Sequence, residues 1–178
     1  MYPPSWPRGT RGFTLVELMT ALTIGAVLLM VAAPALSGML RNGRVVTSAN
    51  ALLGMAHRLH VEAVTKGVRT TACTSLDGLT CSNAADWHDG WIVFPDINLD
   101  GSRDEEEALL FIQPALGGSV KAQGNAPVRR YLSYIPSGRS ASLGGGLQMG
   151  TITICEGGVG RLIVISASGR PRVTSADC

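Results

Sequence analysis

The chain has 178 residues, enough for one domain, of which 46% are hydrophobic and 16% are charged. This composition is too apolar and too weakly charged for a disordered protein, and its 22 Gly and 9 Pro follow no repeat, which excludes collagen. Charge is divided unevenly: residues 1–107 carry 8 Lys/Arg and 11 Asp/Glu, a net charge of −3, whereas residues 108–178 carry 7 and 2, a net charge of +5. The basic C-terminal part therefore needs an explanation.

The N-terminal segment is typical of a membrane anchor. Residues 18–40 contain no formal charge, and a helix of that length spans about 34 Å, enough to cross a bilayer. Arg8 and Arg11 precede this run without an acidic residue, which favours a cytoplasmic N-terminus. Glu17 stands at the head of the run, where a carboxylate is costly and either serves a function or only favours the start of a helix.

Residues 11–17, Arg-Gly-Phe-Thr-Leu-Val-Glu, resemble the processing site of type IV pilins and type II secretion pseudopilins. The resemblance implies that residues 1–12 are a leader peptide, that a prepilin peptidase cleaves between Gly12 and Phe13, and that the new Phe13 amine is methylated. It also implies that Glu17 pairs with the N-terminal amine of a neighbouring subunit in a filament. That pairing would give the buried carboxylate a partner.

Beyond the anchor, the spacing of apolar residues changes to an amphipathic pattern. Between residues 45 and 63 they recur at intervals of three and four, and Gly67 is a suitable helix end. The pattern predicts one long helix: residues 13–40 anchor and polymerise, and residues 41–67 pack under a head formed by residues 68–178.

The rest of the chain predicts a β-rich head. Short apolar or β-branched segments are bounded by turn residues. The segments predicted as strands are residues 69–74, 90–94, 108–113, 130–135, 150–155 and 161–166. A long N-terminal helix before such a head is the α+β architecture of type IV pilins. The details resemble the GspH/FimT group of minor pilins and pseudopilins, which implies two antiparallel sheets against the helix.

Four cysteines, Cys73, Cys81, Cys155 and Cys178, all follow the membrane segment. A head outside the cytoplasmic membrane lies in an oxidising compartment, so disulfides are expected. Three pairings are possible, and proximity in sequence favours Cys73–Cys81, which leaves Cys155–Cys178. The alternative is a zinc site, but the chain has no CxxC pair and no convincing His partner.

The C-terminal segment contains Gly169-Arg170-Pro171-Arg172 after a predicted strand. Glycine permits a tight turn, proline stiffens the backbone, and the planar donors of arginine suit phosphate. On spacing alone, the segment is also consistent with a solvated basic turn. It resembles, however, the Gly-Arg-x-Arg tail motif of FimT-type minor pilins. That resemblance implies that a basic C-terminal loop binds double-stranded DNA for uptake in natural transformation.

Other basic residues are candidates for the same surface. Arg161 is included among the DNA-binding residues, and Lys121, Arg129, Arg130 and Arg139 are candidates for extending it. Binding to phosphates is expected to be sensitive to salt and largely independent of DNA sequence. Two alternatives remain: a minor pseudopilin that serves protein export by type II secretion, and a minor pilin that primes pilus assembly without binding DNA.

Residues 96–107 match the spacing of an EF-hand calcium loop. Oxygen donors occupy positions 1, 3, 5, 9 and 12, which are Asp96, Asn98, Asp100, Asp104 and Glu107, and Gly occupies position 6. Position 8 is an arginine instead of an apolar residue, and the flanking segments are predicted as strands instead of helices. The alternative is an acidic hairpin loop. Calcium, as an ion that orders this loop, is the only cofactor that the sequence suggests.

The sequence contains no nucleophile motif, phosphate-binding loop or dinucleotide fingerprint, so it does not indicate an enzyme. We expect a single-pass protein of the bacterial inner membrane with its head in the periplasm, which later enters a pilus or pseudopilus. The expected partners are other pilin or pseudopilin subunits, prepilin peptidase, double-stranded DNA and, before assembly, the inner membrane.

Overall fold

The computed structural model describes residues 12–166 and 168–178. The predicted leader, except Gly12, therefore lies outside the described residues. The chain divides into two compact units, residues 1–39 and residues 40–178.

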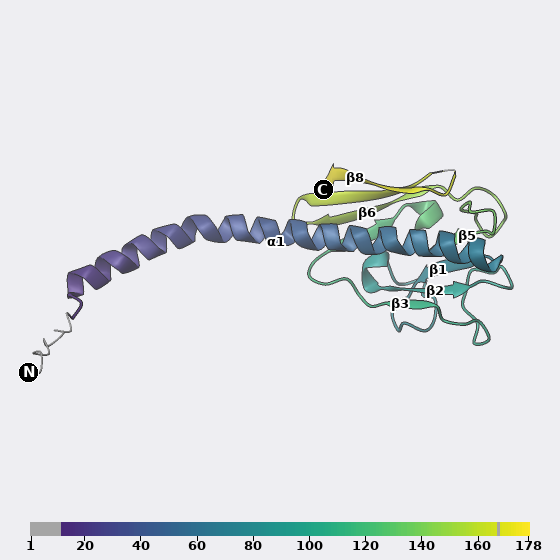
Figure 1. Ribbon diagram of the computed structural model, residues 1–178, viewed down its shortest axis with the longest axis horizontal. Helices are drawn as coiled ribbons and strands as arrows, with labels where there is room; N and C mark the ends of the chain where they lie inside the picture. Colours follow the sequence, from purple (N-terminus) through teal and green to yellow (C-terminus); the bar gives the residue numbers. More distant parts are fainter. Residues whose placement is uncertain (1–11, 167) are drawn as a thin grey trace, which may run out of the picture. The chain divides into compact units, whose positions relative to one another are not determined.

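The described part of the first unit is almost entirely helix α1 (Leu15–Lys66), which continues into the second unit (Figure 1). A capping box begins the helix: the Glu17 amide donates to Thr14 Oγ1 at 3.2 Å, and the Thr14 amide donates to Glu17 Oε2 at 3.4 Å. An 18-residue window of α1 has a mean hydropathy of 2.2 and contains no buried residue. The helix is therefore long and apolar enough to cross a membrane.

The second unit begins with the amphipathic part of α1. Its buried apolar face has the spacing of three and four that a helix requires and comprises Val45, Ala49, Leu52, Ala56, Leu59 and Ala63. The helix ends at Lys66, and the next residue, Gly67, takes a φ of +68° while its amide donates to the Ala63 carbonyl at 3.1 Å. Glycine adopts this left-handed conformation without strain, so it terminates the helix.

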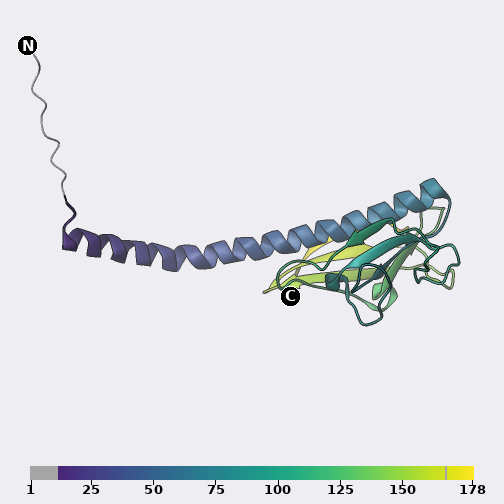
Figure 2. The ribbon, with the colours of Figure 1, turned by 90° about the horizontal axis from the view of Figure 1, so that it is seen from below.

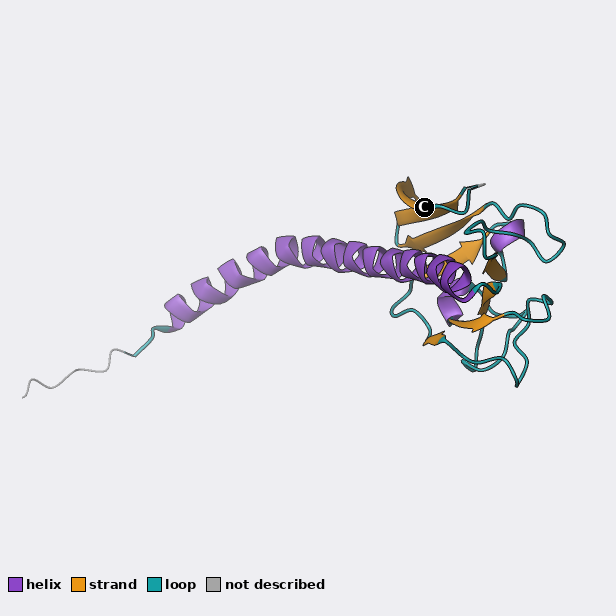
Figure 3. Ribbon diagram, turned by 45° about the vertical axis from the view of Figure 1, so that its right-hand side comes forward, coloured by secondary structure: helices purple, strands orange, loops and turns teal. Residues whose placement is uncertain are grey.

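Two four-stranded antiparallel sheets complete this unit (Figure 3). The first sheet has the order β3-β2-β1-β5, formed by Phe111–Gln113, Trp91–Pro95, Thr70–Thr74 and Tyr131–Tyr134. The second has the order β4-β6-β7-β8, formed by Lys121–Gly124, Gly150–Glu156, Val159–Ile165 and Pro171–Asp177. Two short 3₁₀ helices, η1 (Trp87–Asp89) and η2 (Ala126–Val128), lie in the connections. The predicted α+β architecture with two antiparallel sheets is confirmed.

The core joins the second half of α1 to both sheets, which lie against one side of it (Figures 1 and 2). Its largest buried side chains include Leu52 and Leu59 of α1, Trp91 and Leu132 of the first sheet, and Ile152, Ile154 and Ile163 of the second. A smaller cluster of Cys73, Ile92 and Phe94 lies on the other face of the first sheet. Because both clusters and both disulfides belong to residues 40–178, this unit contains the interactions it needs to fold on its own.

Two strands, β4 and β8, lie outside the segments predicted as strands. Both are edge strands, with one buried residue in β4 and none in β8. A hydrophobic pattern marks a strand only where side chains enter a core, so the pattern misses both. The expectation that the basic C-terminal segment is a loop is therefore wrong, because most of that segment is the edge strand of a β-hairpin.

Candidate functional site

The Gly-Arg-Pro-Arg segment lies at the hairpin that joins β7 to β8. The two strands pair in antiparallel register along their whole length. Hydrogen bonds from the Gly169 amide to the Ser166 carbonyl at 2.9 Å and from the Ser166 amide to the Arg170 carbonyl at 3.3 Å close the turn. Arg170 is in the turn, Arg172 is the second residue of β8, and both are exposed. The hairpin therefore presents two cations to solvent.

Gly169 docks this turn onto the end of the first sheet. It is buried, and its φ is +80°; a Cβ at this position would stand 2.8 Å from the Ser140 amide nitrogen. The Gly169 carbonyl accepts a hydrogen bond from the hydroxyl of Tyr134, a buried residue of β5. Burial raises the pKa of Tyr134 well above its ordinary value, so the hydroxyl stays a donor. The turn is thus fixed by close packing and by a buried hydrogen bond.

The same packing brings a third arginine to the hairpin. Gly138 and Ser140 supply backbone atoms that surround Gly169, and the exposed residue between them is Arg139. We call Arg139, Arg170 and Arg172 the hairpin site. Arg139 is far from the other two along the chain, so only the fold reveals that it belongs beside them.

The other predicted basic residues lie elsewhere. Arg161 is on β7, where the register and the alternation of side chains place it on the opposite face of the sheet from Arg172. Arg130 is paired with Asp86 at 2.9 Å and also donates to the Ala85 carbonyl, so its charge is largely balanced. Lys121 is on β4, at the other edge of the second sheet. These residues do not extend the hairpin site directly.

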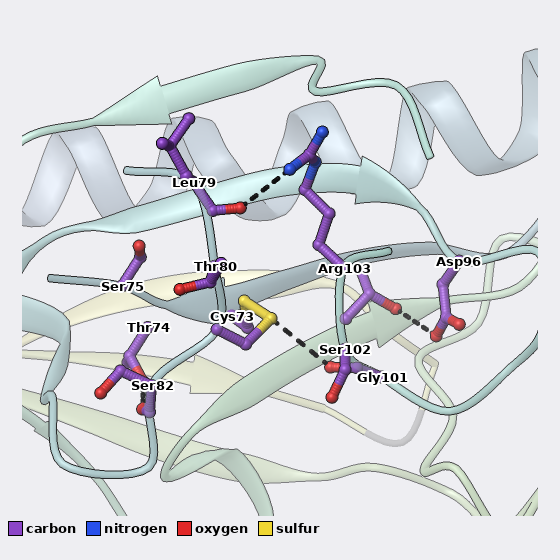
Figure 4. The surroundings of a disulfide bond; sticks show 12 residues. Cys73, Thr74, Ser75, Leu79, Thr80, Ser82, Asp96, Gly101, Ser102 and Arg103 are labelled. Atoms are coloured by element: carbon purple, nitrogen blue, oxygen red, sulfur yellow. Dashed lines mark hydrogen bonds between the residues drawn. A yellow bond between two sulfur atoms is a disulfide. The ribbon is translucent and has the colours of Figure 1, made fainter. Parts of the chain in front are cut away.

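Two disulfides are present, Cys73–Cys81 and Cys155–Cys178, with Cα–Cα distances of 5.5 and 6.0 Å. They are the pairs that proximity in sequence favours. The first closes the loop after β1 (Figure 4). The second joins the residue after β8 to β6, so β8 is held by the docked turn at one end and by a covalent bond at the other.

The acidic loop after β2 is ordered by its own hydrogen bonds. Asn98 Nδ2 donates to Asp100 Oδ2 at 3.0 Å and to Asp104 Oδ2 at 2.8 Å, so an amide stands between two predicted calcium ligands. Glu107 is buried, and its carboxylate accepts a hydrogen bond from the Ile97 amide at 2.7 Å. These bonds use the side chains that the EF-hand pattern assigns to a cation.

The first and eighth positions of that loop are also engaged. Asp96 is buried and accepts a hydrogen bond from the Thr71 hydroxyl at 2.9 Å. Arg103 donates to the carbonyls of Glu107 at 3.1 Å and of Leu79 at 3.0 Å, which links the acidic loop to the disulfide loop (Figure 4). Within residues 12–166 and 168–178, no group of three or more His, Cys, Asp or Glu side chains is placed to hold a metal ion. The predicted calcium loop is therefore not a preformed metal site.

The residues predicted for processing and assembly lie at the start of α1. Gly12, Phe13 and Glu17 are all exposed. The carboxylate of Glu17 accepts one long hydrogen bond, from the Thr14 amide at 3.4 Å, as part of the capping box. A carboxylate held by so weak a bond is available to a stronger, cationic donor such as an N-terminal amine.

An ion pair that the sequence did not suggest ties α1 to the second sheet. Arg44 Nη2 lies 2.7 Å from Glu156 Oε1, and Arg44 Nε lies 2.9 Å from Glu156 Oε2, a bidentate arrangement. Glu156 is buried at the end of β6. The hydrogen bond from Arg44 lowers the pKa of Glu156 and raises that of Arg44. No local pattern could have indicated this pair, because its members are far apart in sequence.

Comparison with known proteins gives the family. The model described as type II transport protein GspH matches residues 48–169, more than half of the chain. The chain belongs to the GspH family. In this GspH-family protein a second model, the prokaryotic N-terminal methylation motif, matches residues 7–33, which include the predicted processing site. No curated protein matches the sequence.

The fold of this GspH-family protein resembles solved minor pilins and pseudopilins. The type IV minor pilin FimU of Pseudomonas aeruginosa is 19% identical with a TM-score of 0.54, covering 75% of this chain and 89% of that chain. The minor pseudopilin EpsH of the type 2 secretion system of Vibrio cholerae is 14% identical with a TM-score of 0.51, covering 74% and 97%. At these identities the likeness shows the type IV pilin fold and does not separate a pilus from a secretion function.

Proposed function

We propose that this GspH-family protein is a minor type IV pilin whose C-terminal hairpin binds double-stranded DNA for uptake in natural transformation. The observation that carries the proposal is the docked turn, which presents Arg170 and Arg172 while Gly169 and Tyr134 hold the backbone in place. Guanidinium groups bind phosphate through several N–H donors. A turn that is already ordered loses little conformational entropy on binding.

The charge around the hairpin supports the same proposal. Residues 157–176 contain no acidic residue, and Arg139 adds a third exposed cation beside the turn. Arg161 contributes positive potential from the other face of the same strands, at a distance and not through a shared contact surface. Contacts of this kind are made to phosphates, so we expect binding that depends on salt and little on DNA sequence.

Maturation and assembly complete the proposal. We infer that a prepilin peptidase cleaves after Gly12, that the Phe13 amine is methylated, and that α1 holds the protein in the inner membrane with its head in the periplasm. During assembly with other pilin subunits, Glu17 exchanges its capping hydrogen bond for the cationic amine of a neighbour. The methylation motif at residues 7–33 supports this sequence of events.

A second candidate function is a minor pseudopilin in protein export. The observation that favours it is the likeness to EpsH, of which 97% is covered, together with the type II transport description of the family. DNA binding separates the two candidates, because export does not require a phosphate-binding hairpin. A pilin that primes assembly without binding DNA gives the same result as the pseudopilin in such an experiment.

The test measures DNA binding by the full-length protein in detergent micelles, using fluorescence anisotropy of a labelled duplex. We expect the double variant Arg170→Gln/Arg172→Gln to bind at least about tenfold more weakly, which corresponds to about 1.4 kcal/mol. Losing two phosphate contacts should also reduce the slope of log affinity against log salt by roughly two units. Arg41→Gln, which removes a cation near Gly157 at the other end of β7, should have little effect.

Cells that carry the double variant should lose transformation while the protein still enters fibres at its normal level. The proposal fails if the wild-type protein binds duplex DNA no better than the double variant at low salt. The export or priming function then takes its place.

A further inference from the structure

One face of the second sheet carries a group of threonines beside Arg172. Side chains alternate across a strand, and the buried residues Ile152, Ile154 and Ile163 mark the face that packs toward the core. The opposite face of the three strands is formed near the hairpin by Thr151 and Thr153 of β6, Leu162 and Val164 of β7, and Arg172 and Thr174 of β8. We call these six residues the threonine face.

The register arranges the threonine face in two rows. Thr151, Val164 and Arg172 lie side by side across the three strands in one row. Thr153, Leu162 and Thr174 form the next row, and both of these threonines are exposed. Adjacent strands are about 4.8 Å apart, so the hydroxyls of β6 and β8 in a row are roughly 10 Å apart. One nucleic-acid backbone can therefore meet both.

Charge is divided between the two faces of these strands. Their two acidic residues, Glu156 and Asp177, both pair with Val159 in the register and so share the core-side face. Arg161 also lies on that side. Over β6, β7 and β8, all of whose residues are described, the threonine face contains a cation and no carboxylate. A polyanion is therefore attracted to this face and repelled by the charges on the other.

The favourable surface ends at β4. Gln123 of this strand donates to Asp86 Oδ2 at 2.9 Å, so a carboxylate stands at that edge. Repulsion by Asp86 directs a polyanion along β6, β7 and β8 and not across to β4.

We propose that the threonine face is the continuation of the DNA-binding surface beyond the hairpin site. A duplex held by Arg170 and Arg172 lies over β8 and toward β6, and the hydroxyls of Thr174 and Thr153 donate to its phosphate oxygens. Hydroxyl groups of this kind make backbone contacts that position a protein on DNA without reading its sequence. The inference rests on the proposed function of the hairpin and adds which face of the sheet the DNA covers.

The test compares two neighbouring residues of β8 that point to opposite faces. Thr174→Glu and Ser175→Glu introduce the same charge at adjacent exposed positions of one edge strand. In the full-length protein in detergent, Thr174→Glu should weaken duplex binding at least fivefold, and Ser175→Glu less than twofold. Thr153→Glu should resemble Thr174→Glu, although it lies two strands away. Melting temperatures measured alongside should match among the three, which excludes a difference in folding.

Each other outcome overturns the inference in a recognisable way. If Thr174→Glu and Ser175→Glu weaken binding equally, the face is irrelevant and only total charge counts. If neither weakens it while Arg170→Gln/Arg172→Gln still does, the hairpin function stands and the threonine face has no part in it. If Thr174→Glu binds DNA normally but fails to enter fibres, the face is a contact between subunits. If the wild-type protein binds no DNA, the proposed function fails together with this extension.

Discussion

Replacing Gly169 with alanine tests whether the turn must be docked before the arginines can bind DNA. The change removes no charge, but it places a Cβ 2.8 Å from the Ser140 amide nitrogen at a φ of +80°. An L-residue in the left-handed region costs about 1–2 kcal/mol. If only the docked turn binds, a shift of about 1–2 kcal/mol toward the undocked turn lowers the affinity roughly five- to thirtyfold.

Fluorescence anisotropy with a labelled duplex measures the affinity, and hydrogen exchange of the Arg170 amide reports whether the turn has loosened. Gly158→Ala is the matched control, because Gly158 has a φ of +89° with no atom within 4 Å of its added Cβ. It lies in the turn between β6 and β7, at the other end of the hairpin strand, so its strain should leave DNA binding unchanged. Wild-type affinity of Gly169→Ala together with faster exchange would refute the reasoning that a preformed turn matters.

Three further predictions concern maturation, assembly and acid stability. Mass spectrometry of the mature protein should find a methylated N-terminal Phe13, and Gly12→Val should leave the full-length form in the membrane. Glu17→Gln keeps an acceptor for the helix cap but loses the charge, so it should enter fibres as poorly as Glu17→Ala; normal incorporation would mean that the cap alone is needed. Because Arg44 lowers the pKa of Glu156, the ion pair stabilises the head above about pH 4.3, and this contribution is lost as the pH falls through the lowered pKa. Urea unfolding of residues 40–178 should therefore show a flatter dependence on acidic pH for Glu156→Gln than for wild type, and equal slopes would contradict the pair.

The elements that the sequence predicts well are those with a local signal. The start of α1 follows from Thr14 and Glu17, which have the spacing of a capping box. Its buried face follows from the spacing of apolar residues, and its end follows from Gly67. The core strands carry β-branched and aromatic residues on the side that enters the core, so they too can be predicted from short windows of sequence.

The candidate site depends on contacts between distant segments, which short windows do not contain. The strand β8 begins with a proline and buries no residue, so it has the composition of a loop. Arg139 belongs to the hairpin site only because Gly169 packs against its neighbours. The EF-hand spacing of residues 96–107 is correct as a pattern, but spacing does not show that Asn98 binds two of the acidic residues itself.

The Cys155–Cys178 bond determines how the hairpin responds to a pulling force. An edge strand is easily removed from a sheet by peeling, which breaks its hydrogen bonds one after another from a free end. Here β8 has no free end at which peeling can begin, because the turn is docked and the last residue is bonded to β6. Tension applied at the arginines passes along the peptide chain and the sulfur–sulfur bond to Cys155. The next residue is Glu156, and its bidentate bond to Arg44 delivers the tension to α1, so a retracting fibre can haul on its cargo without unzipping the sheet.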